Sequence, residues 1–159
     1  MQFLTGPVLF LDFDGVLHPV GEEALDENFR LLPNPKLFQW RPILEQLLEP
    51  WPEVQIIVSS DWRRLFDDDN LVRLLGPRLG GRFIGVVEVI DSSRANELHL
   101  EVVRRGIVQW VALDDHPTVV AVSKAEPRFI VCDPSTGLSD LDVQERLKRQ
   151  LTRFIKGSQ

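Results

Sequence analysis

The segment VLFLDFDGVL, residues 8–17, decides the fold of this chain of 159 residues. Its first four residues are all apolar, which is typical of a strand buried on both faces of a parallel sheet. Asp12 and Asp14 follow this run directly, and Gly15 comes next. In α/β proteins, ligands bind outside the carboxyl ends of the strands. The two carboxylates are therefore expected at a ligand-binding edge, although Asp-Gly is also a common turn dipeptide.

Further apolar runs alternate with amphipathic stretches along the chain, which favours an α/β fold with a mostly parallel sheet covered by helices on both faces. The runs expected to form strands are 54–58, 110–113, 119–122 and 129–131, and 82–87 fits either a strand or a hairpin arm. The stretches with helical spacing are 43–48, 95–103 and 143–155. The middle helix is expected to begin after Ser92 or Ser93 and to end at Gly106, and the last to begin at Ser139. The acidic run 67–69 fits a helix N-terminus.

The chain length fits one domain, which we place at residues 1–156, with 157–159 as a tail. Proline and glycine interrupt residues 15–39, and we interpret this stretch as a flap, because long irregular loops in compact domains are usually functional. The single cysteine, Cys132, excludes an intramolecular disulfide and a thiolate zinc site. Cys132 is expected to be buried and inert.

The net charge of −6 argues against bulk binding to duplex nucleic acid. The N-terminus has no basic leader, and the uncharged runs are far shorter than the ~20 residues that cross a bilayer. We therefore expect a cytoplasmic protein without a membrane partner. The last helix is basic, which we attribute to the helix dipole rather than to RNA contacts. Its cations are Arg146, Lys148, Arg149, Arg153 and Lys156.

Polar side chains follow three of the expected strands. Asp12 and Asp14 follow the first, Ser59-Ser60 the second and Asp114-Asp115 the third. In a parallel sheet these groups meet at one edge, where four carboxylates would repel one another, so either some of them are protonated or a cation is present. Oxygen ligands without imidazole or thiolate select Mg²⁺ among the common metals.

This chemistry suits phosphoryl transfer. An aspartate beside Mg²⁺ can attack phosphorus and form an aspartyl-phosphate. A second acid two residues along can protonate the leaving oxygen and later activate water. A cationic side chain is also needed to stabilise the charge on the phosphoryl oxygens.

The residues in this order resemble the haloacid dehalogenase (HAD) superfamily. Residues 12–17 resemble its motif I, Asp-x-Asp-Gly-x-Leu, while Ser59 or Ser60 resembles motif II and Asp114-Asp115 resembles motif IV. With residues 59–63 and 136–138, the chain is similar to a small subgroup, the HAD domain found alone or attached to RNA-repair (Swiss Army Knife) proteins. The resemblance implies a Rossmannoid three-layer sandwich, in which the small flap 15–39 stands in for a large cap.

The resemblance also implies roles for these residues in a Mg²⁺-dependent phosphatase. Asp12 is expected to be the nucleophile, and Asp14 the general acid/base, whose backbone carbonyl also binds the metal. Ser59 or Ser60 is expected to donate to the phosphoryl group. The residues that would complete the Mg²⁺ site are Asp114 and Asp115. Arg94 best matches the position where the family usually has lysine, and Arg63 could share that role; arginine keeps the charge as a planar fork.

Several alternatives stay open at the level of the sequence. The substrate could be a phosphorylated small molecule, a nucleotide or a nucleic-acid end, because a site without a large cap would be open. A non-catalytic module that binds Mg²⁺ and phosphate is one alternative, and Arg94 in place of lysine favours it. A protein-interaction module, whose flap or last helix binds a partner, is another. Trp62 fits either the core or a wall of the phosphate site. His18, in the flap, fits a solvent-exposed loop better than a substrate contact. His116 is expected to orient the residues that bind the metal rather than to bind the metal itself.

Overall fold

The sheet of this protein has five parallel strands in the order β3-β2-β1-β4-β5. The structure is a computed structural model and describes residues 6–154. The strands are β1 (Val8–Leu11), β2 (Gln55–Val58), β3 (Phe83–Val86), β4 (Trp110–Asp114) and β5 (Phe129–Val131). The central strand, β1, pairs with β2 and β4 and is completely buried, as its uninterrupted apolar sequence predicts.

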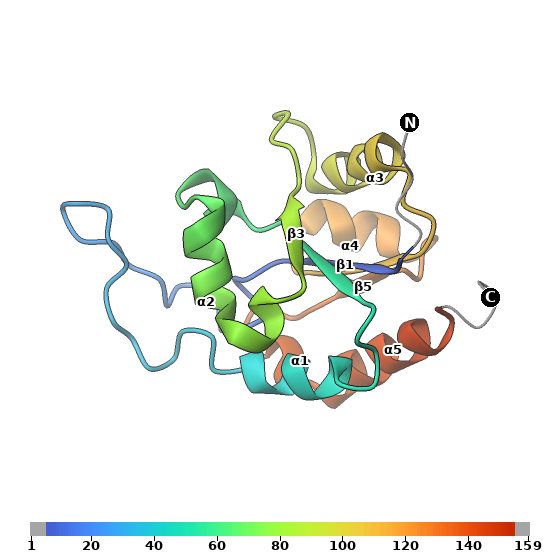
Figure 1. Cartoon of the computed structure of the whole chain (residues 1–159), viewed down its shortest axis with the longest axis horizontal. Coiled ribbons are helices and arrows are strands. Elements are labelled where there is room, and N and C mark those ends of the chain that lie inside the picture. Colours follow the sequence, from blue (N-terminus) through green and yellow to red (C-terminus); the bar gives the residue numbers. More distant parts are fainter. Residues whose placement is uncertain (1–5, 155–159) are drawn as a thin grey trace.

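Helices cover both faces of the sheet, so the molecule has the three layers that the sequence predicts (Figure 1). One face carries α1 (Arg41–Leu48), α2 (Asp68–Gly80) and α5 (Leu141–Thr152), and the other carries α3 (Arg94–Arg105) and α4 (Pro117–Ser123). Successive residues of a strand point to opposite faces. Accordingly, Leu9 and Leu11 pack in the first core, and Val8 and Phe10 pack in the second.

Several helix ends are where the sequence predicts them. Asp67 caps α2 by accepting a hydrogen bond from the backbone of Asn70, and Ser93 caps α3 in the same way. Gly106 ends α3 in the left-handed conformation, with φ of 65°. The residue that caps α5 is Asp140, so the prediction that Ser139 begins this helix is wrong by one residue.

Two predictions about strands need correction or refinement. Residues 119–122 belong to α4 and not to a strand, because Pro117 occupies the first turn and His116 caps the helix. A short apolar run is ambiguous between a strand and a buried helix, so periodicity alone could not decide. Residues 83–86 form a parallel edge strand rather than a hairpin arm.

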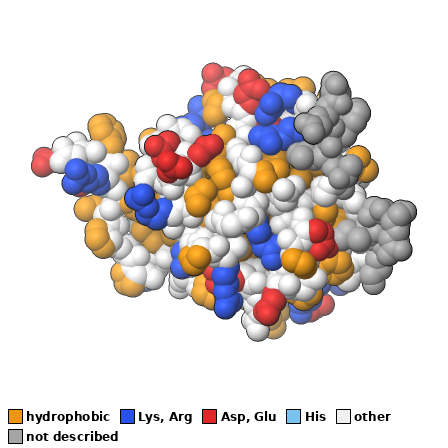
Figure 2. Space-filling view, in the orientation of Figure 1, with side chains coloured by type: hydrophobic (Ala, Val, Ile, Leu, Met, Phe, Trp, Pro, Cys, Tyr) orange, Lys and Arg blue, Asp and Glu red, His pale blue; other side chains and the backbone are white. Residues whose placement is uncertain are grey.

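The flap, residues 15–39, leaves the sheet after β1 and extends away from the helices (Figure 1). At its tip Leu25 and Leu31 form an isolated antiparallel bridge. Asp26 accepts hydrogen bonds there from the backbone N–H groups of Asn28 (2.8 Å) and Arg30 (2.9 Å). The space-filling view shows this tip as a projection that carries apolar and charged side chains (Figure 2).

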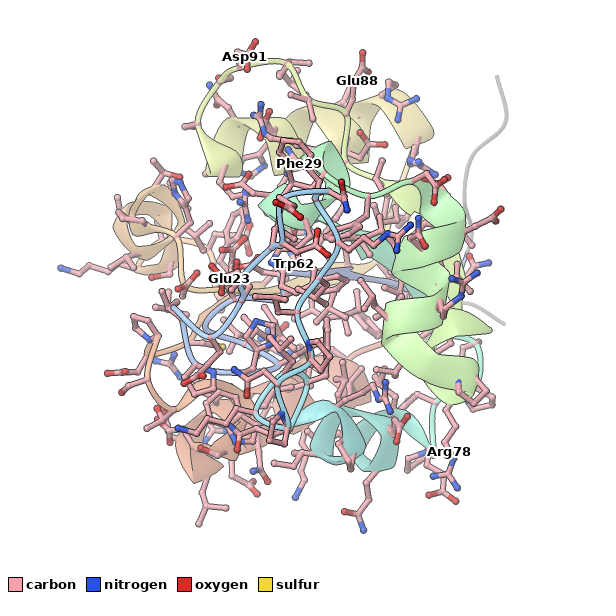
Figure 3. The ribbon with its side chains drawn as sticks, turned by 90° about the vertical axis from the view of Figure 1, so that its left-hand side faces the viewer. Glu23, Phe29, Trp62, Arg78, Glu88 and Asp91 are labelled. Carbon is pink, nitrogen blue, oxygen red and sulfur yellow. The ribbon has the colours of Figure 1, made fainter. Side chains whose placement is uncertain are left out.

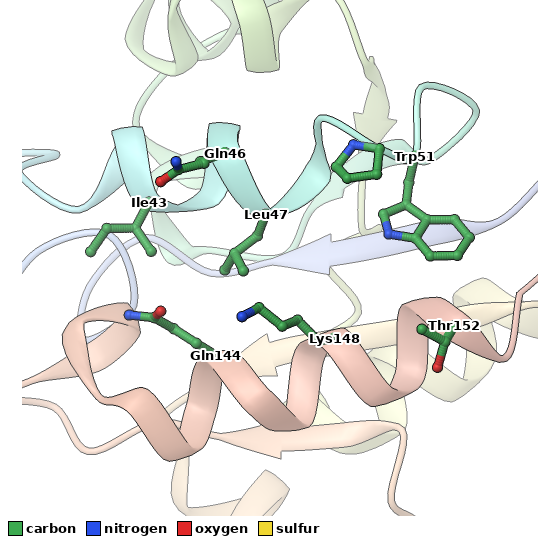
Figure 4. A pocket seen from close by; sticks show the side chains of 8 residues that line it. Ile43, Gln46, Leu47, Trp51, Gln144, Lys148 and Thr152 are labelled. Carbon is green, nitrogen blue, oxygen red and sulfur yellow. The ribbon is translucent and has the colours of Figure 1, made fainter.

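Two further features complete the description of residues 6–154. No helix in this range is long and apolar enough to cross a bilayer. A cavity of about 500 Å³ lies between α1 and α5, and Leu47, Trp51 and Lys148 are among its lining residues (Figure 4). None of the predicted site residues lines this cavity. Ile155 and the predicted tail 157–159 fall outside the described residues.

Candidate active site

The ends of β1, β2 and β4 bring Asp12, Ser59 and Asp114 side by side. The register pairs Leu11 with Val58 and with Leu113, so the following residues of β1 and β2 lie beside Asp114 at the end of β4. The backbone N–H of Asp12 donates to the Leu113 carbonyl oxygen at 3.2 Å and continues this ladder. Side chains alternate along a strand, which places all three on the side of the sheet covered by α3.

Three carboxylates form a compact group at this edge. Oxygen atoms of Asp12, Asp114 and Asp115 all lie within 4.8 Å of one another. Asp12 is only 4% exposed and Asp114 is fully buried. Burial raises the pKa of Asp12 well above its ordinary value, and the negative charge of Asp114 raises it further. Burial also raises the pKa of Asp115, so the group resists carrying three negative charges.

Arg94, the first residue of α3, provides positive charge beside these carboxylates. Its Nη1 lies 2.8 Å from Oδ2 of Asp114 and 3.7 Å from Oδ1 of Asp12. Its Nη2 lies 3.2 Å from Oδ1 of Asp61. Burial lowers the pKa of the guanidinium, but the charges of Asp114 and Asp12 outweigh burial and raise it. Arg94 therefore lies where the sequence places a cation, and it stays charged.

Gly15 lets the segment after β1 approach Asp115. Its φ of 75° is in the left-handed region that favours glycine. A Cβ atom built on Gly15 would come within 2.6 Å of Cγ of Asp115, so a larger residue would displace this carboxylate. Glycine is therefore favoured at position 15 both by its left-handed backbone and by the close approach of the Asp115 side chain.

Asp14 points into a separate cluster on the flap side of the site. His18 Nε2 lies 2.7 Å from Oδ1 of Asp14, and Trp62 Nε1 donates to Oδ2 at 2.9 Å. Because His18 Nδ1 accepts a hydrogen bond from the backbone N–H of Phe38 (3.2 Å), its proton is on Nε2 and is donated to Asp14. Burial raises the pKa of Asp14, but these hydrogen bonds outweigh it and lower the pKa. A carboxylate oxygen of Glu23 also belongs to this cluster, within 4.8 Å of ligand atoms of Asp14 and His18 (Glu23 is labelled in Figure 3).

His18 is completely buried, so the prediction of a solvent-exposed loop histidine is wrong. Its ring packs edge-on against Phe38, with 5.1 Å between the ring centroids. Trp62 is 3% exposed and its ring packs in the core, while its N–H donates to Asp14. A wall of the phosphate site, the other role considered for it, stays a prediction. One feature of the sequence could have indicated this contact, because His18 follows Asp14 by four residues in a tight turn. Assigning His18 to an irregular flap led to the wrong prediction.

The structure distinguishes the two serines that follow β2. Ser60 accepts a hydrogen bond from the backbone N–H of Trp62 at 3.2 Å and caps the 3₁₀ turn Asp61–Arg64. Ser59 Oγ is buried and has no hydrogen-bond partner among residues 6–154. A buried hydroxyl without a partner costs about 1–3 kcal/mol, and natural proteins rarely leave one without a reason. Ser59 therefore has a free hydroxyl on the same side of the sheet as Asp12.

Arg63 lies near the site, but its guanidinium is engaged by the protein itself. Nε donates to the Val87 carbonyl oxygen at 2.8 Å, Nη1 donates to that of Ser59 at 2.8 Å, and Nη2 lies 2.9 Å from Glu97. These contacts tie the ends of β2 and β3 to α3. The geometry supports a structural role for Arg63, and its part in substrate binding stays a prediction.

The donor set of the carboxylate group fits a hard divalent cation. Its ligand atoms are all carboxylate oxygens, which suit Mg²⁺ and not a soft metal. Cys132 lies beside the group, but burial and the charge of Asp114 raise the pKa of its thiol far above the usual range. His116 uses Nδ1 to accept a hydrogen bond from Thr118 N–H at 3.2 Å, and its backbone N–H donates to Asp114 at 3.0 Å. Neither Cys132 nor His116 belongs to a group of side chains whose ligand atoms come together around a possible metal position among residues 6–154.

Comparison with known proteins identifies the family to which the chain belongs. Residues 8–143 match a protein family described as "HAD domain in Swiss Army Knife RNA repair proteins". No curated protein and no solved structure matches the chain at a significant level. The matched range contains every residue of the candidate site.

Proposed function

Because the chain belongs to the family of HAD domains of Swiss Army Knife RNA repair proteins, a branch of the HAD hydrolases, we propose that it is a Mg²⁺-dependent phosphomonoester hydrolase. One observation carries the proposal. The nucleophile candidate Asp12, the partnerless hydroxyl of Ser59 and the charged Arg94 share one side of the sheet edge. Together they supply an attacking oxygen, a hydrogen-bond donor and a positive charge for one phosphoryl group.

The carboxylate oxygens of Asp12, Asp114 and Asp115, with the backbone carbonyl of Asp14, are the ligands we propose for Mg²⁺. A bound Mg²⁺ would neutralise these carboxylates and polarise the phosphoryl oxygens. The raised pKa of Asp12 supports this proposal. It means that the negative charge of Asp12 is not fully compensated in the folded protein, and a bound cation would compensate it.

In the proposed reaction, Asp12 attacks phosphorus and the bond from phosphorus to the leaving oxygen breaks. Asp14 gives its proton to that oxygen, and an aspartyl-phosphate remains on Asp12. A water molecule then attacks phosphorus and passes a proton to Asp14. Phosphate leaves and the carboxylate of Asp12 is restored. Ser59 and Arg94 hold the phosphoryl oxygens in both steps.

His18 and Trp62 are positioning residues for Asp14 in this scheme. Each donates to a different oxygen of the carboxylate, at 2.7 and 2.9 Å, and so fixes its rotation. The Phe38 backbone fixes the tautomer of His18 in turn. These bonds favour the ionised form of Asp14, which suits the base that activates water. The first step needs the protonated form, so in this scheme Asp14 must take up a proton before the leaving oxygen departs.

The test is release of phosphate from p-nitrophenyl phosphate with Mg²⁺ and with EDTA. Asp12→Asn should abolish metal-dependent release. The two serines form a matched pair. Ser59→Ala should lower kcat about 100-fold, as expected for loss of one donor to a transition-state oxygen. Ser60→Ala should keep the rate and lose only about 1 kcal/mol of stability as a lost cap. Full activity of Asp12→Asn would contradict the proposal.

For the substrate class we propose a phosphomonoester at the end of a nucleic-acid strand. The family description names RNA repair proteins. The irregular flap 15–39 is small, so the site is open enough for the bulky end of a nucleic-acid strand. Oligonucleotides with a 5′- or a 3′-phosphate should be hydrolysed with higher kcat/KM than nucleoside monophosphates and phosphorylated small molecules. A preference for the small substrates would reject this class and leave the phosphatase proposal intact.

A non-catalytic module is the second candidate, and one observation favours it. Arg94 already lies 2.8 Å from Asp114 and 3.7 Å from Asp12, so part of the negative charge is balanced without a metal. This candidate predicts that Mg²⁺ or inorganic phosphate raises the melting temperature, while none of the substrates above is hydrolysed. Turnover that Asp12→Asn removes would exclude it.

A further inference from the structure

Basic side chains border the free edge of the sheet along β5. Two adjoining cavities, of about 320 and 240 Å³, lie here and share Pro127, Gln150 and Arg153. We call them together the edge groove. Its walls come from α4 and α5, which cover opposite faces of the sheet, so the groove spans the edge strand. The cations that line it are Lys124, Arg128, Arg146, Arg149 and Arg153.

Most of this positive charge is not neutralised by the protein. Lys124, Arg149 and Arg153 are exposed and have no acidic partner among residues 6–154. Arg146 pairs with Asp142 at 3.3 Å, but both side chains are about half exposed or more, which makes the pair weak. The acid that lines the groove is Glu126, which is bound by Arg128 at 2.7 Å. A chain with a net charge of −6 thus gathers unpaired cations in one place.

Two simpler explanations account for only part of this arrangement. The helix dipole favours cations in the last turn of α5, which suits Arg149 and Arg153, but Arg146 lies in the middle of this helix. Charged side chains also protect an edge strand from pairing with other chains. Neither explanation requires that Lys124, at the end of α4, should line the same hollow as two arginines of α5 and the arginine that follows this helix.

We propose that the edge groove binds the phosphodiester backbone of a single-stranded nucleic acid whose end reaches Asp12. The inference rests on the proposed nucleic-acid substrate and adds a second contact to it. Four of the five cations are arginines, whose planar forks match phosphate oxygens and stay charged. The aromatic rings here are buried, since Trp110 and Phe129 are each 2% exposed and Arg128 covers Trp110. The groove would therefore hold the backbone without stacking on bases.

The position of the groove relative to the candidate active site supports one continuous path. Val131, the last residue of β5, pairs with Asp114, and Phe129 and Ile130 line the groove. Strand residues advance about 3.3 Å each, so Ile130 and Phe129 lie roughly 3 and 7 Å behind the level of Asp114 along β5. The groove continues toward the N-terminal end of β4, since Gln109 and Trp110 also line it, so a nucleic-acid strand held at its end by the catalytic residues would have to run along the edge of the sheet to occupy it.

The test is fluorescence anisotropy of a labelled single-stranded oligonucleotide without terminal phosphates, so that binding does not depend on the catalytic residues. The full chain with Asp12→Asn should bind it as well as the unchanged chain. Arg149→Gln with Arg153→Gln should weaken binding at least tenfold and lower the slope of log K against log salt by about 1.4, since each phosphate contact on a single strand contributes about 0.7. Arg73→Gln, an exposed cation on α2 without an acidic partner among residues 6–154, is the matched control and should change nothing.

Three outcomes would overturn the inference. One is unchanged affinity in the double variant while its circular dichroism and melting temperature match those of the parent. Another is an equal loss with Arg73→Gln, which would indicate bulk charge instead of a groove. The third is equal binding of a polyglutamate peptide, which would identify the groove as a site for acidic protein segments. The anisotropy assay measures binding independently of phosphate release. It therefore distinguishes a protein that binds the oligonucleotide without phosphatase activity from an active phosphatase that does not bind it in the edge groove.

Discussion

Replacing Arg94 with glutamine tests whether this guanidinium compensates the buried carboxylates. Arg94 is 5% exposed and contacts Asp12, Asp114 and Asp61, the first two of which are themselves buried. The change removes one partner of a buried ion pair and leaves the others uncompensated. Removing one partner of such a pair costs about 3–5 kcal/mol, because the remaining charge stays buried.

The expected loss can be stated as a melting temperature. For a chain of this size 1 kcal/mol corresponds to about 2–4 °C, so Arg94→Gln should lower the Tm by roughly 6–20 °C in EDTA. Without the guanidinium the folded-state pKa of Asp12, which burial already raises, should rise further. A folded-state pKa above the unfolded one means that the native state binds more protons, so stability falls as pH rises between the two values. The loss should therefore be larger at pH 7.5 than at pH 5.

Thermal melts followed by circular dichroism, in EDTA and in Mg²⁺, provide the measurement. Mg²⁺ should reduce the loss, because a second cation then balances the same carboxylates. Arg94→Gln with Asp114→Asn should recover much of the stability, since both members of the 2.8 Å pair are then neutral. Arg73→Gln, on the surface of α2, should change stability by no more than about 0.5 kcal/mol. A Tm for Arg94→Gln within 2 °C of the parent in EDTA would refute this reasoning.

Four further predictions follow from the same site. Burial raises the pKa of Asp12 and Asp115, so their ionisation destabilises the metal-free fold as pH rises, and Mg²⁺ should raise the Tm more at pH 7.5 than at pH 5; equal shifts at both pH values would contradict this. Gly15→Ala should cost about 1–2 kcal/mol for its left-handed backbone, and calorimetry should show weaker Mg²⁺ binding because the new methyl group displaces the Asp115 carboxylate. His18→Phe should lower kcat at least tenfold with little change in KM, whereas His18→Gln, which keeps a donor, should recover part of the rate; equal rates in the two variants would argue for a purely structural role. Cys132 should react with a thiol reagent only after unfolding, because it is buried and its thiol pKa is raised, and rapid labelling of the native protein would show the opposite.

Much of the fold could be predicted because its signals are local. The apolar run before Asp12 is read directly as a buried central strand, and the limits of α3 follow from Ser93 and Gly106. Residues 119–122 could not be assigned in this way, because four apolar residues fit a strand as well as one face of a short helix. The cap at Asp140 was missed for a similar reason, since Ser139 one residue earlier is an equally good capping residue by type.

The site could be predicted as a set of residues but not as a set of contacts. The order of the motifs indicated Asp12, Arg94 and Asp114, which do lie together. The choice between Ser59 and Ser60 needed the strand register, because neighbouring residues face opposite ways. The burial of His18 depends on Phe38, twenty residues away, and no local pattern encodes that contact.

The central position of β1 determines the order in which the protein can be assembled during synthesis. Val8 pairs with Gln55 on one side and with Trp110 on the other, and β1 emerges from the ribosome before either partner. A nascent chain that ends after β2 contains Asp12 and Ser59 but neither Arg94 nor Asp114. Sheets that join distant segments fold slowly, since long loops must close first. Asp12 meets Arg94 and Asp114 only when most of the chain has been translated, so unfinished chains lack the complete carboxylate group.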